Sequence, residues 1–444
     1  MIFTQFVDDA LGCASYLVGD PGTGDAVVVD PAFASEQYLD EAAKRGVRIV
    51  RAIETHTHAD HLSGHGRLAL EHGIAVSIHP AAEAEYPNDP MPDGTEIALG
   101  DIILRCIHTP GHRPEHCCLA VSDRTRGDDA WIVLTGDSLF VGDAARPDLA
   151  VEAREGAEGL FHSLRRLVEL GDGVEVYPGH VAGSLCGKAM SSKASTTIGF
   201  ERRFNPALAY DDLSLFIAES TGISAPRPPN MERIVEMNRG PFVGSQPAPS
   251  ELPLPPDGAQ VLDVRPIEAF AAGHHAGALS VPVSGTGFAT KAAFVLGAGA
   301  VTVTASDEDE VVLAVRGLHS VGHLDIAGYV LGGGAEALEL VSIDQLDALL
   351  ADGAELIDVR EKDERDSGYI AGSRNIPYRL LALGEADLPR DKPIVTICET
   401  GPRAAIAASI LAARGFDAHP VVNGGIDSWM AAGRPTVEFR RCGS

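Results

Sequence analysis

Apolar segments alternate with amphipathic ones along most of the chain, a pattern typical of layered α/β folds. The run VVVD at residues 27–30 predicts a buried strand, and Ser35 could cap a helix predicted for EQYLDEAAKRG at residues 36–46. A second strand, IVRAIETH at residues 49–56, leads into a polar loop. We therefore expect strands covered by helices.

Proline marks the boundary between two parts of the chain. Nine prolines occur between residues 226 and 256. Neither a helix nor a central strand tolerates that density, because proline lacks a backbone N–H group and restricts its neighbours. The sequence predicts an inter-domain linker here.

Beyond the prolines the sequence repeats itself. VLDVRPIEAFAAGHHAGALSVP at residues 261–282 aligns without gaps on LIDVREKDERDSGYIAGSRNIP at residues 356–377, with a constant offset of 95 residues. Identical pairs are Asp263 with Asp358, Arg265 with Arg360, Gly273 with Gly368, Gly277 with Gly372, and Pro282 with Pro377. This period is too long for a solenoid and predicts two tandem domains of about 100 residues each.

The charge of the chain restricts its partners. It has 35 Lys and Arg against 63 Asp and Glu, a formal net charge of -28. Such a surface repels nucleic acid and anionic lipid, so we expect neither nucleic-acid nor membrane partners. The N-terminus resembles no signal peptide, and the seven irregularly spaced cysteines favour reduced thiols. We expect a soluble, cytoplasmic homo-oligomer.

Histidines and aspartates gather at predicted strand ends in the first half. The string THTHADH at residues 55–61 follows a predicted strand, and HTPGH, TGD and YPGH follow three further strands. Any one histidine alone could have a structural role, but together they predict a metal site, since Gly-containing turns let strand ends converge. The candidate ligands are His56, His58, Asp60, His61, His112, Asp137 and His180.

This arrangement resembles the metallo-β-lactamase superfamily over residues 1–240. The resemblance implies an αββα sandwich with metal between the sheets. One metal position would use His56, His58 and His112, and a second would use Asp60, His61 and His180, with Asp137 between them. The ligands permit either a dinuclear zinc hydrolase or a mononuclear iron enzyme.

The segment TGDSLFVGDAARPDL at residues 135–149 is similar to the persulfide dioxygenase branch of that superfamily. This resemblance implies one Fe(II) per chain, held by His56, His112 and Asp137, with zinc as the alternative. Arg146 and Asp148 would bind the thiol carrier, although Arg146 could also be a surface ion pair. Glutathione-using members have Gly-Cys-Gly before this arginine, whereas here Asp-Ala-Ala occupies residues 143–145, so the thiol is not identified.

Two cysteines are candidates for handling sulfane sulfur. Cys186 follows His180 by six residues, and similar fused proteins imply a persulfide-handling role for it; a small buried side chain is the alternative. In PIVTICETGPRAAIAASILAARG, Cys398 and Arg403 bracket a loop between a predicted strand and helix. Backbone N–H groups and the Arg403 charge would stabilise the Cys398 thiolate there.

Residues 339–438 resemble a rhodanese domain. The first copy, residues 245–338, has no cysteine, since none lies between Cys186 and Cys398. Its counterpart of the Cys398 loop is expected near residues 303–309. We expect a catalytically empty copy that serves as a spacer, docking face or dimer contact.

These patterns lead to one preferred function and two alternatives. The preferred enzyme oxidises low-molecular-weight thiol persulfides with O2 to sulfite at a mononuclear non-haem iron. It also transfers sulfane sulfur through Cys398, forming or using thiosulfate, and tethering would couple the two sites. One alternative is a zinc thioester hydrolase resembling glyoxalase II, fused to a sulfurtransferase. The other is a non-catalytic sulfur-relay or redox-sensing module.

Overall fold

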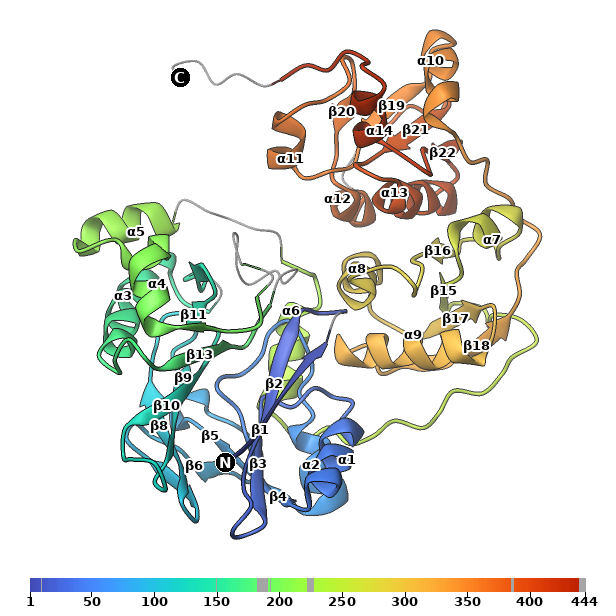
Figure 1. The fold of residues 1–444 in the computed structure, drawn as a ribbon. Coiled ribbons are helices and arrows are strands. Elements are labelled where there is room, and N and C mark those ends of the chain that lie inside the picture. Colours follow the sequence, from blue (N-terminus) through green and yellow to red (C-terminus); the bar gives the residue numbers. More distant parts are fainter. Residues whose placement is uncertain are drawn as a thin grey trace. The chain divides into compact units, whose positions relative to one another are not determined.

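A computed structural model describes most of the chain, in two compact units. The described residues are 1–8, 10–148, 150–181, 191, 193–221, 227–384 and 387–438. The first unit comprises residues 1–246 with 319–322, and the second comprises 247–318 with 323–444 (Figure 1). Among the described residues, no helix is both long and apolar enough to cross a bilayer.

The first unit contains two six-stranded sheets. One has the order β1-β2-β3-β4-β5-β6, with β1 Ile2–Asp8, β2 Cys13–Asp20, β3 Asp25–Val29, β4 Arg48–Ile53, β5 Ala75–Ile78 and β6 Asp89–Pro90. The other has the order β14-β13-β10-β9-β8-β7, with β7 Glu96–Leu99, β8 Ile102–His108, β9 Cys117–Asp123, β10 Ala130–Gly136, β13 Glu175–Pro178 and β14 Thr196–Thr197. Strands β11 Leu139–Phe140 and β12 Asp143–Ala144 form a separate hairpin.

Helices cover the outer face of each sheet. The helices of this unit are α1 Glu36–Arg45, α2 His65–His72, α3 Ala153–Val168, α4 Ile198–Phe204, α5 Leu213–Thr221 and α6 Met231–Arg239, with short 3-10 helices at Pro80–Ala82 and Pro206–Leu208. Alternate residues of β3 explain the layers, because side chains along a strand point to opposite faces. Val27 and Val29 pack between the sheets, whereas Val28 packs with Tyr38 of α1. The expected αββα sandwich is present.

Two local expectations for this unit need correction. Ser35 is the N-cap of α1, but its hydroxyl makes no cap hydrogen bond. Its φ of -83° and ψ of -9° are already helical, and a capping side chain needs an extended backbone. The proline-rich segment also contains a helix, because α6 occupies the proline-free stretch between Pro229 and Pro241. The boundary between the two units falls after Gln246, within the predicted linker.

The second unit contains two four-stranded parallel sheets of the same order. The first is β16-β15-β17-β18, with β15 Gln260–Asp263, β16 Leu279–Ser280, β17 Val301–Ala305 and β18 Ile326–Leu331. The second is β20-β19-β21-β22, with β19 Glu355–Asp358, β20 Arg374–Asn375, β21 Ile394–Ile397 and β22 Ala418–Pro420. Their helices are α7 Ile267–Ala272, α8 Phe288–Val295, α9 Glu308–Ser320, α10 Ile343–Ala351, α11 Lys362–Asp366, α12 Tyr378–Leu383, α13 Pro402–Ala413 and α14 Ile426–Ala431.

The repeated sequence produces the same buried ion pair twice. Arg265 donates to both carboxylate oxygens of Asp263, at 2.9 and 2.5 Å, and Arg360 donates to both of Asp358, at 3.0 and 2.7 Å. Each guanidinium also donates to the carbonyl oxygen of the aligned glycine, at 2.8 and 2.7 Å. The two segments therefore have the same local structure.

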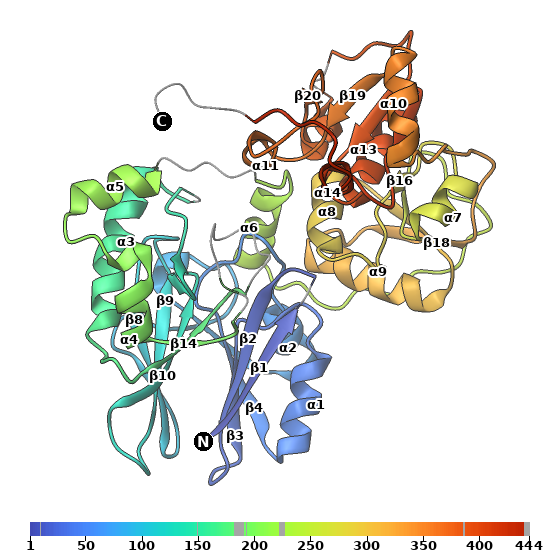
Figure 2. The ribbon, with the colours of Figure 1, turned by 45° about the horizontal axis from the view of Figure 1, so that its top comes forward.

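The two copies pack directly against each other. Helix α13 lies against β16 (Figure 2), and α12 lies against α8 (Figure 1). The backbone N–H of Ser280 donates to the Ser409 hydroxyl across this contact, at 3.0 Å. The carboxyl end of the last copy's sheet therefore lies close to its neighbour.

Candidate functional site

Three strand ends bring His56, His112 and Asp137 together. They follow β4, β8 and β10, and each side chain is at most 2% exposed. One potential ligand atom from each lies within 4.8 Å of the others. Nε2 of His56 and of His112 lie 3.9 and 3.5 Å from Oδ2 of Asp137. The structure thus forms a buried set of two histidines and one carboxylate.

This set fits a divalent metal ion. Ligand atoms about 2.1 Å from a metal are about 3 to 3.5 Å apart, close to the spacing seen here. Burial lowers the pKa of both His56 and His112, so their imidazoles are neutral and can ligate. Burial alone would raise the pKa of Asp137, but the neighbouring His180 holds it below its usual range. A buried, ionised carboxylate beside neutral imidazoles is the donor set such an ion needs.

Hydrogen bonds around His56 fix which of its nitrogens faces Asp137. The Thr55 hydroxyl donates to Asp30 at 2.8 Å and lies 2.9 Å from Nδ1 of His56. Because the only hydrogen of that hydroxyl points to Asp30, its oxygen accepts a hydrogen bond from the Nδ1–H of His56. Nε2 therefore carries the free lone pair that faces Asp137.

His116, which was not a candidate from sequence, holds the backbone of Asp137 in place. Its Nε2 accepts a hydrogen bond from the Asp137 backbone N–H at 2.9 Å. Burial and the neighbouring His112 lower the pKa of His116 to about 3, so this nitrogen keeps its lone pair. The string HTPGHRPEH contains His116, but the spacing of its histidines does not show which of them ligates a metal and which only hydrogen-bonds to a ligand residue.

His58 lies in a different buried group. Its Nε2 is 3.2 Å from Oδ1 of Asp30 and 3.3 Å from Oε2 of Glu54. Although burial opposes a charge, the two carboxylates raise the pKa of His58 well above its usual value. Asp30 and Glu54 were not candidates from sequence, because each is a single acidic residue directly after a strand, outside the histidine motifs. The assignment of His58 as a metal ligand stays a prediction.

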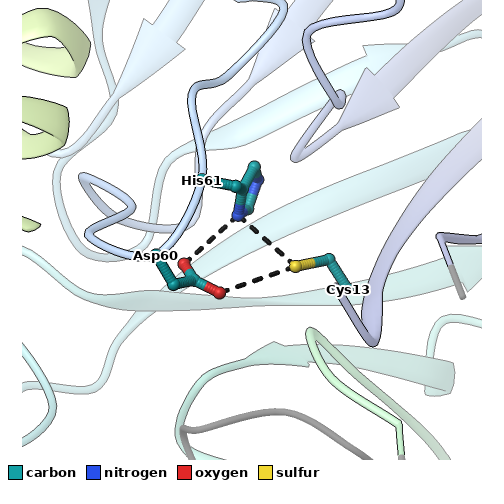
Figure 3. A group of neighbouring side chains, drawn as sticks. All are labelled: Cys13, Asp60 and His61. Atoms are coloured by element: carbon teal, nitrogen blue, oxygen red, sulfur yellow. Dashed lines mark hydrogen bonds and ion pairs between the residues drawn. The ribbon is translucent and has the colours of Figure 1, made fainter. Parts of the chain in front are cut away.

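Cys13 joins Asp60 and His61 in a third group (Figure 3). Its Sγ, at the start of β2, lies 3.5 Å from both Oδ2 of Asp60 and Nδ1 of His61. Nε2 of His180 lies 3.4 Å from Asp60 and 3.2 Å from Asp137, so His180 connects this group to the first. No motif surrounds Cys13 in the sequence, and only the fold places it here.

Asn238 of α6 holds the loop that carries the histidines. Its amide donates to the carbonyl oxygens of His58 and His61 at 2.9 and 2.8 Å, and its Oδ1 accepts from Ser63 N–H at 2.9 Å. The side chain is 2% exposed. The helix within the predicted linker therefore belongs to the metal-binding unit.

Removing the Asn238 amide should destabilise the first unit. Asn238→Ala leaves three buried backbone groups unpaired, so we expect a loss of about 2 to 4 kcal/mol. Pulse proteolysis of the full chain in urea, following fragments of the first unit, measures this loss. Asn88→Ala is the control, since Asn88 makes one bond within its own turn. Equal stability of the two variants would contradict the assigned role.

Arg146 and Asp148 form an ion pair beyond the β11–β12 hairpin. Nε and Nη2 of Arg146 donate to the two oxygens of Asp148 at 3.2 and 2.9 Å. Arg146 is only 8% exposed, so a simple surface pair does not describe it. Arg227 also lies 3.5 Å from Asp148. Their role in substrate binding stays a prediction.

The Cys398 loop surrounds its thiol as expected for a strand-to-helix turn. Cys398 follows β21, is 1% exposed, and accepts a hydrogen bond from Gly401 N–H at 3.1 Å. A φ of +117° at Gly401 aims that N–H inward, in a region that favours glycine. Arg403 donates to both oxygens of Glu364 at 2.7 and 2.6 Å. Glu364 therefore neutralises much of the positive charge that was expected to stabilise the Cys398 thiolate. The other candidate, Cys186, lies outside the described residues.

The middle copy has alanine at the place of this cysteine. In the sheets, Asp263 pairs with Thr304 just as Asp358 pairs with Ile397. The next residue is Ala305 in one copy and Cys398 in the other. A buried methyl group thus occupies the thiol position, within the range 303–309 expected from the repeat.

Family comparisons agree with this architecture. Residues 8–180 match the metallo-beta-lactamase superfamily, and residues 342–432 match the rhodanese-like domain. The chain therefore contains a metallo-beta-lactamase domain, followed by a C-terminal rhodanese-like domain. The predicted fold class is confirmed, and the two domains together indicate an enzyme whose first domain binds metal.

The curated relatives cover about half of this chain, and one solved structure covers 74% of it. The mitochondrial persulfide dioxygenase ETHE1 of Bos taurus is 28% identical over 229 residues, 50% of this chain and 82% of the bovine protein. An uncharacterized protein of Mycobacterium tuberculosis is 32% identical over 235 residues, 47% of this chain and 98% of its own length. A crystal structure named as a metallo-beta-lactamase from Staphylococcus aureus aligns with a TM-score of 0.68 at 28% identity, over 74% of this chain and 99% of that one.

Proposed function

We propose that this chain is a persulfide dioxygenase coupled to a sulfurtransferase, with domains at residues 1–240, 245–338 and 339–438. The observation that carries the proposal is the buried set of His56, His112 and Asp137. Two histidines and one carboxylate on one face of Fe(II) leave three positions for O2 and substrate. The bovine persulfide dioxygenase relative supports this choice of metal and reaction.

The first reaction would convert RSSH, O2 and H2O into RSH, sulfite and two protons. When bound, iron would supply O2 activation. The chain would contribute a site shielded from water by the two sheets, with His116 and Thr55 holding the ligands in place. Arg146 would bind the anionic part of the thiol carrier.

The second reaction would use Cys398 as a sulfur carrier. Its thiolate would attack the outer sulfur of a persulfide, forming one S–S bond and breaking another, and the departing thiolate would take the bonding electron pair. Sulfite could then accept that sulfur from Cys398 to give thiosulfate. The Gly401 N–H and the start of α13 would stabilise the charged sulfur throughout.

Metal content and O2 uptake test the proposal together. Protein supplied with iron should hold about one iron per chain and consume O2 when given a low-molecular-weight thiol persulfide. Several persulfides should be compared, since the sequence does not identify the thiol. Bound zinc with thioester hydrolysis and no O2 uptake would overturn the assignment.

A second candidate is a dinuclear zinc hydrolase. His180 favours it, because its Nε2 lies within 3.4 Å of Asp60 and 3.2 Å of Asp137, where a second ion could be held. Hydrolysis would then use a metal-activated water. Two zinc ions per chain would be its signature.

Loss of Arg146 should weaken substrate binding more than catalysis. Arg146→Ala removes a cation but leaves the metal ligands intact, so the apparent KM for persulfide should rise more than kcat falls. Steady-state O2 uptake measures both constants. Arg124→Ala, an exposed arginine of the same unit, is the control. Unchanged kinetics with every persulfide would assign Arg146 a structural role.

A further inference from the structure

A pocket lies beside the Cys398 loop, between the two copies of the second unit. Its volume is about 260 Å³. Thr400, Gly401 and Pro402 of the loop line one side, and Val281, Pro282 and Lys291 of the middle copy line the other. Both copies therefore line this pocket, which borders the loop that carries Cys398, although only one copy has a cysteine.

Lys291 gives this pocket a positive charge. Among the described residues that line it, Lys291 is the only basic one, and Glu268 is the only acidic one and is exposed. Lys291 is half-buried on α8, and its Nζ donates to the Thr286 carbonyl oxygen at 2.5 Å. That single bond leaves two ammonium donors for a ligand.

The charges of Lys291 and the Cys398 site influence each other. Burial and the Arg403 charge lower the pKa of Lys291, while the Cys398 thiolate acts in the opposite direction. Arg403 is already paired with Glu364 through two hydrogen bonds. Lys291 is therefore the cation better placed to meet an incoming anion.

An anionic ligand needs such a cation here. The chain carries a net charge of -28, and Glu364 and Glu399 both lie within 4 Å of Arg403, so an unassisted anion would be repelled. Most of the remaining lining is apolar, including Ile267, Val281 and Ile406, which suits a carbon-bearing or weakly hydrated sulfur compound.

We propose that Lys291 of the middle copy is the anion-binding residue of the Cys398 pocket, which takes a low-molecular-weight anionic sulfur compound. Thiosulfate and a carboxylate-bearing thiol share this chemistry. The inference rests on the sulfur-transfer function proposed for Cys398. It gives the copy without a thiol a direct part in substrate recognition.

With thiosulfate, the transfer step is balanced without another reagent. The Cys398 thiolate attacks the outer sulfur, a new S–S bond forms at Sγ, and the S–S bond of thiosulfate breaks. Its electron pair leaves with sulfite, and the negative charge of the thiolate moves to the Cys398 persulfide. Lys291 binds the sulfonate oxygens and takes no part in the bond exchange, so it is a binding residue.

Kinetics of the full chain test the assignment. Lys291→Met should raise the KM for thiosulfate about tenfold, with kcat for thiocyanate formation from cyanide within about twofold of wild type. Lys291→Arg should restore most of the affinity. Lys392→Met is the control. Lys392 forms an ion pair with Glu355 at the amino ends of β19 and β21, whereas Cys398 follows the carboxyl end of β21. Wild-type KM in Lys291→Met would overturn the inference.

Binding without turnover separates this inference from the sulfur-transfer proposal. In a Cys398→Ser background, calorimetric titration with thiosulfate should show about tenfold weaker binding when Lys291→Met is added and no change with Lys392→Met. Equal binding in both double variants would overturn the inference even if wild type transfers sulfur. Absence of transfer by wild type, with the binding difference intact, would instead overturn the proposed function.

The choice of acceptor identifies the source of the anion. Mercaptoacetate and the neutral 2-mercaptoethanol should be compared as acceptors of sulfur from Cys398, with the donor thiosulfate at saturating concentration. A rise in KM of Lys291→Met that is confined to the donor thiosulfate and the acceptor mercaptoacetate supports anion binding, and a rise for thiosulfate alone restricts the ligand to the inorganic anion. An equal defect with the neutral thiol would overturn the assignment.

Discussion

His112→Ala should abolish persulfide-dependent O2 consumption while leaving sulfur transfer from thiosulfate intact. The substitution removes one of the three buried groups around the proposed metal position, and alanine offers no lone pair in its place. Residual metal would be held by one histidine and Asp137, so iron content should also fall well below one per chain. The Cys398 loop belongs to the other compact unit and keeps its own contacts.

O2 uptake, iron content and thiocyanate formation from thiosulfate and cyanide, all on the same preparation, measure these effects. His72→Ala, an exposed histidine at the end of α2, controls for the loss of an imidazole. Loss of both activities without unfolding would contradict the two-site arrangement. Full O2 uptake in His112→Ala would remove His112 from the ligand set.

Cys398→Ser should change the sulfur product without stopping O2 consumption. Serine keeps the size of the side chain, but its hydroxyl stays protonated and carries no sulfane sulfur. Wild type supplied with persulfide and O2 should release thiosulfate, because sulfite from the first site meets sulfur on Cys398. The variant should accumulate sulfite instead.

Arg403→Ala provides a graded comparison for the same experiment. It should slow sulfur transfer less than Cys398→Ser, because the Gly401 N–H still donates to the thiol. The pairing of Arg403 with Glu364 gives a further reason for a mild effect. Separation of sulfite and thiosulfate by ion chromatography, corrected for their spontaneous reaction with persulfide, gives the yields. Wild-type thiosulfate yield from Cys398→Ser would falsify the coupling.

Periodic and motif-bearing parts of the molecule were predictable from sequence. The apolar run before Asp30 is β3, and its alternate valines separate the sandwich interior from the helical layer. The strings around His56, His112 and Asp137 each end a strand, so their convergence follows from the layered fold. The repeat predicted two similar tandem domains, and the second unit contains two sheets of the same strand order.

Contacts made by single residues from distant segments were not predictable. Asn238 hydrogen-bonds to the histidine loop from a helix that was not predicted, because prolines surround it in the sequence. Nothing in its local sequence indicates a partner 177 residues away. Cys13 approaches Asp60 only because β2 lies beside that loop. The distribution of histidines among three groups also depends on side-chain direction, which spacing along one loop does not specify.

Both copies of the repeated domain contain a buried aspartate–arginine pair, but only one contains a cysteine that could react. Both copies keep the same guanidinium–carboxylate geometry, yet one has Ala305 where the other has Cys398. The pair therefore anchors the first turn of each domain and does not depend on a reactive thiol. A duplicated domain of this kind is a natural starting point for redesign. The sheet and its Asp–Arg pair form without the cysteine, so a different nucleophilic side chain could be introduced at Ala305.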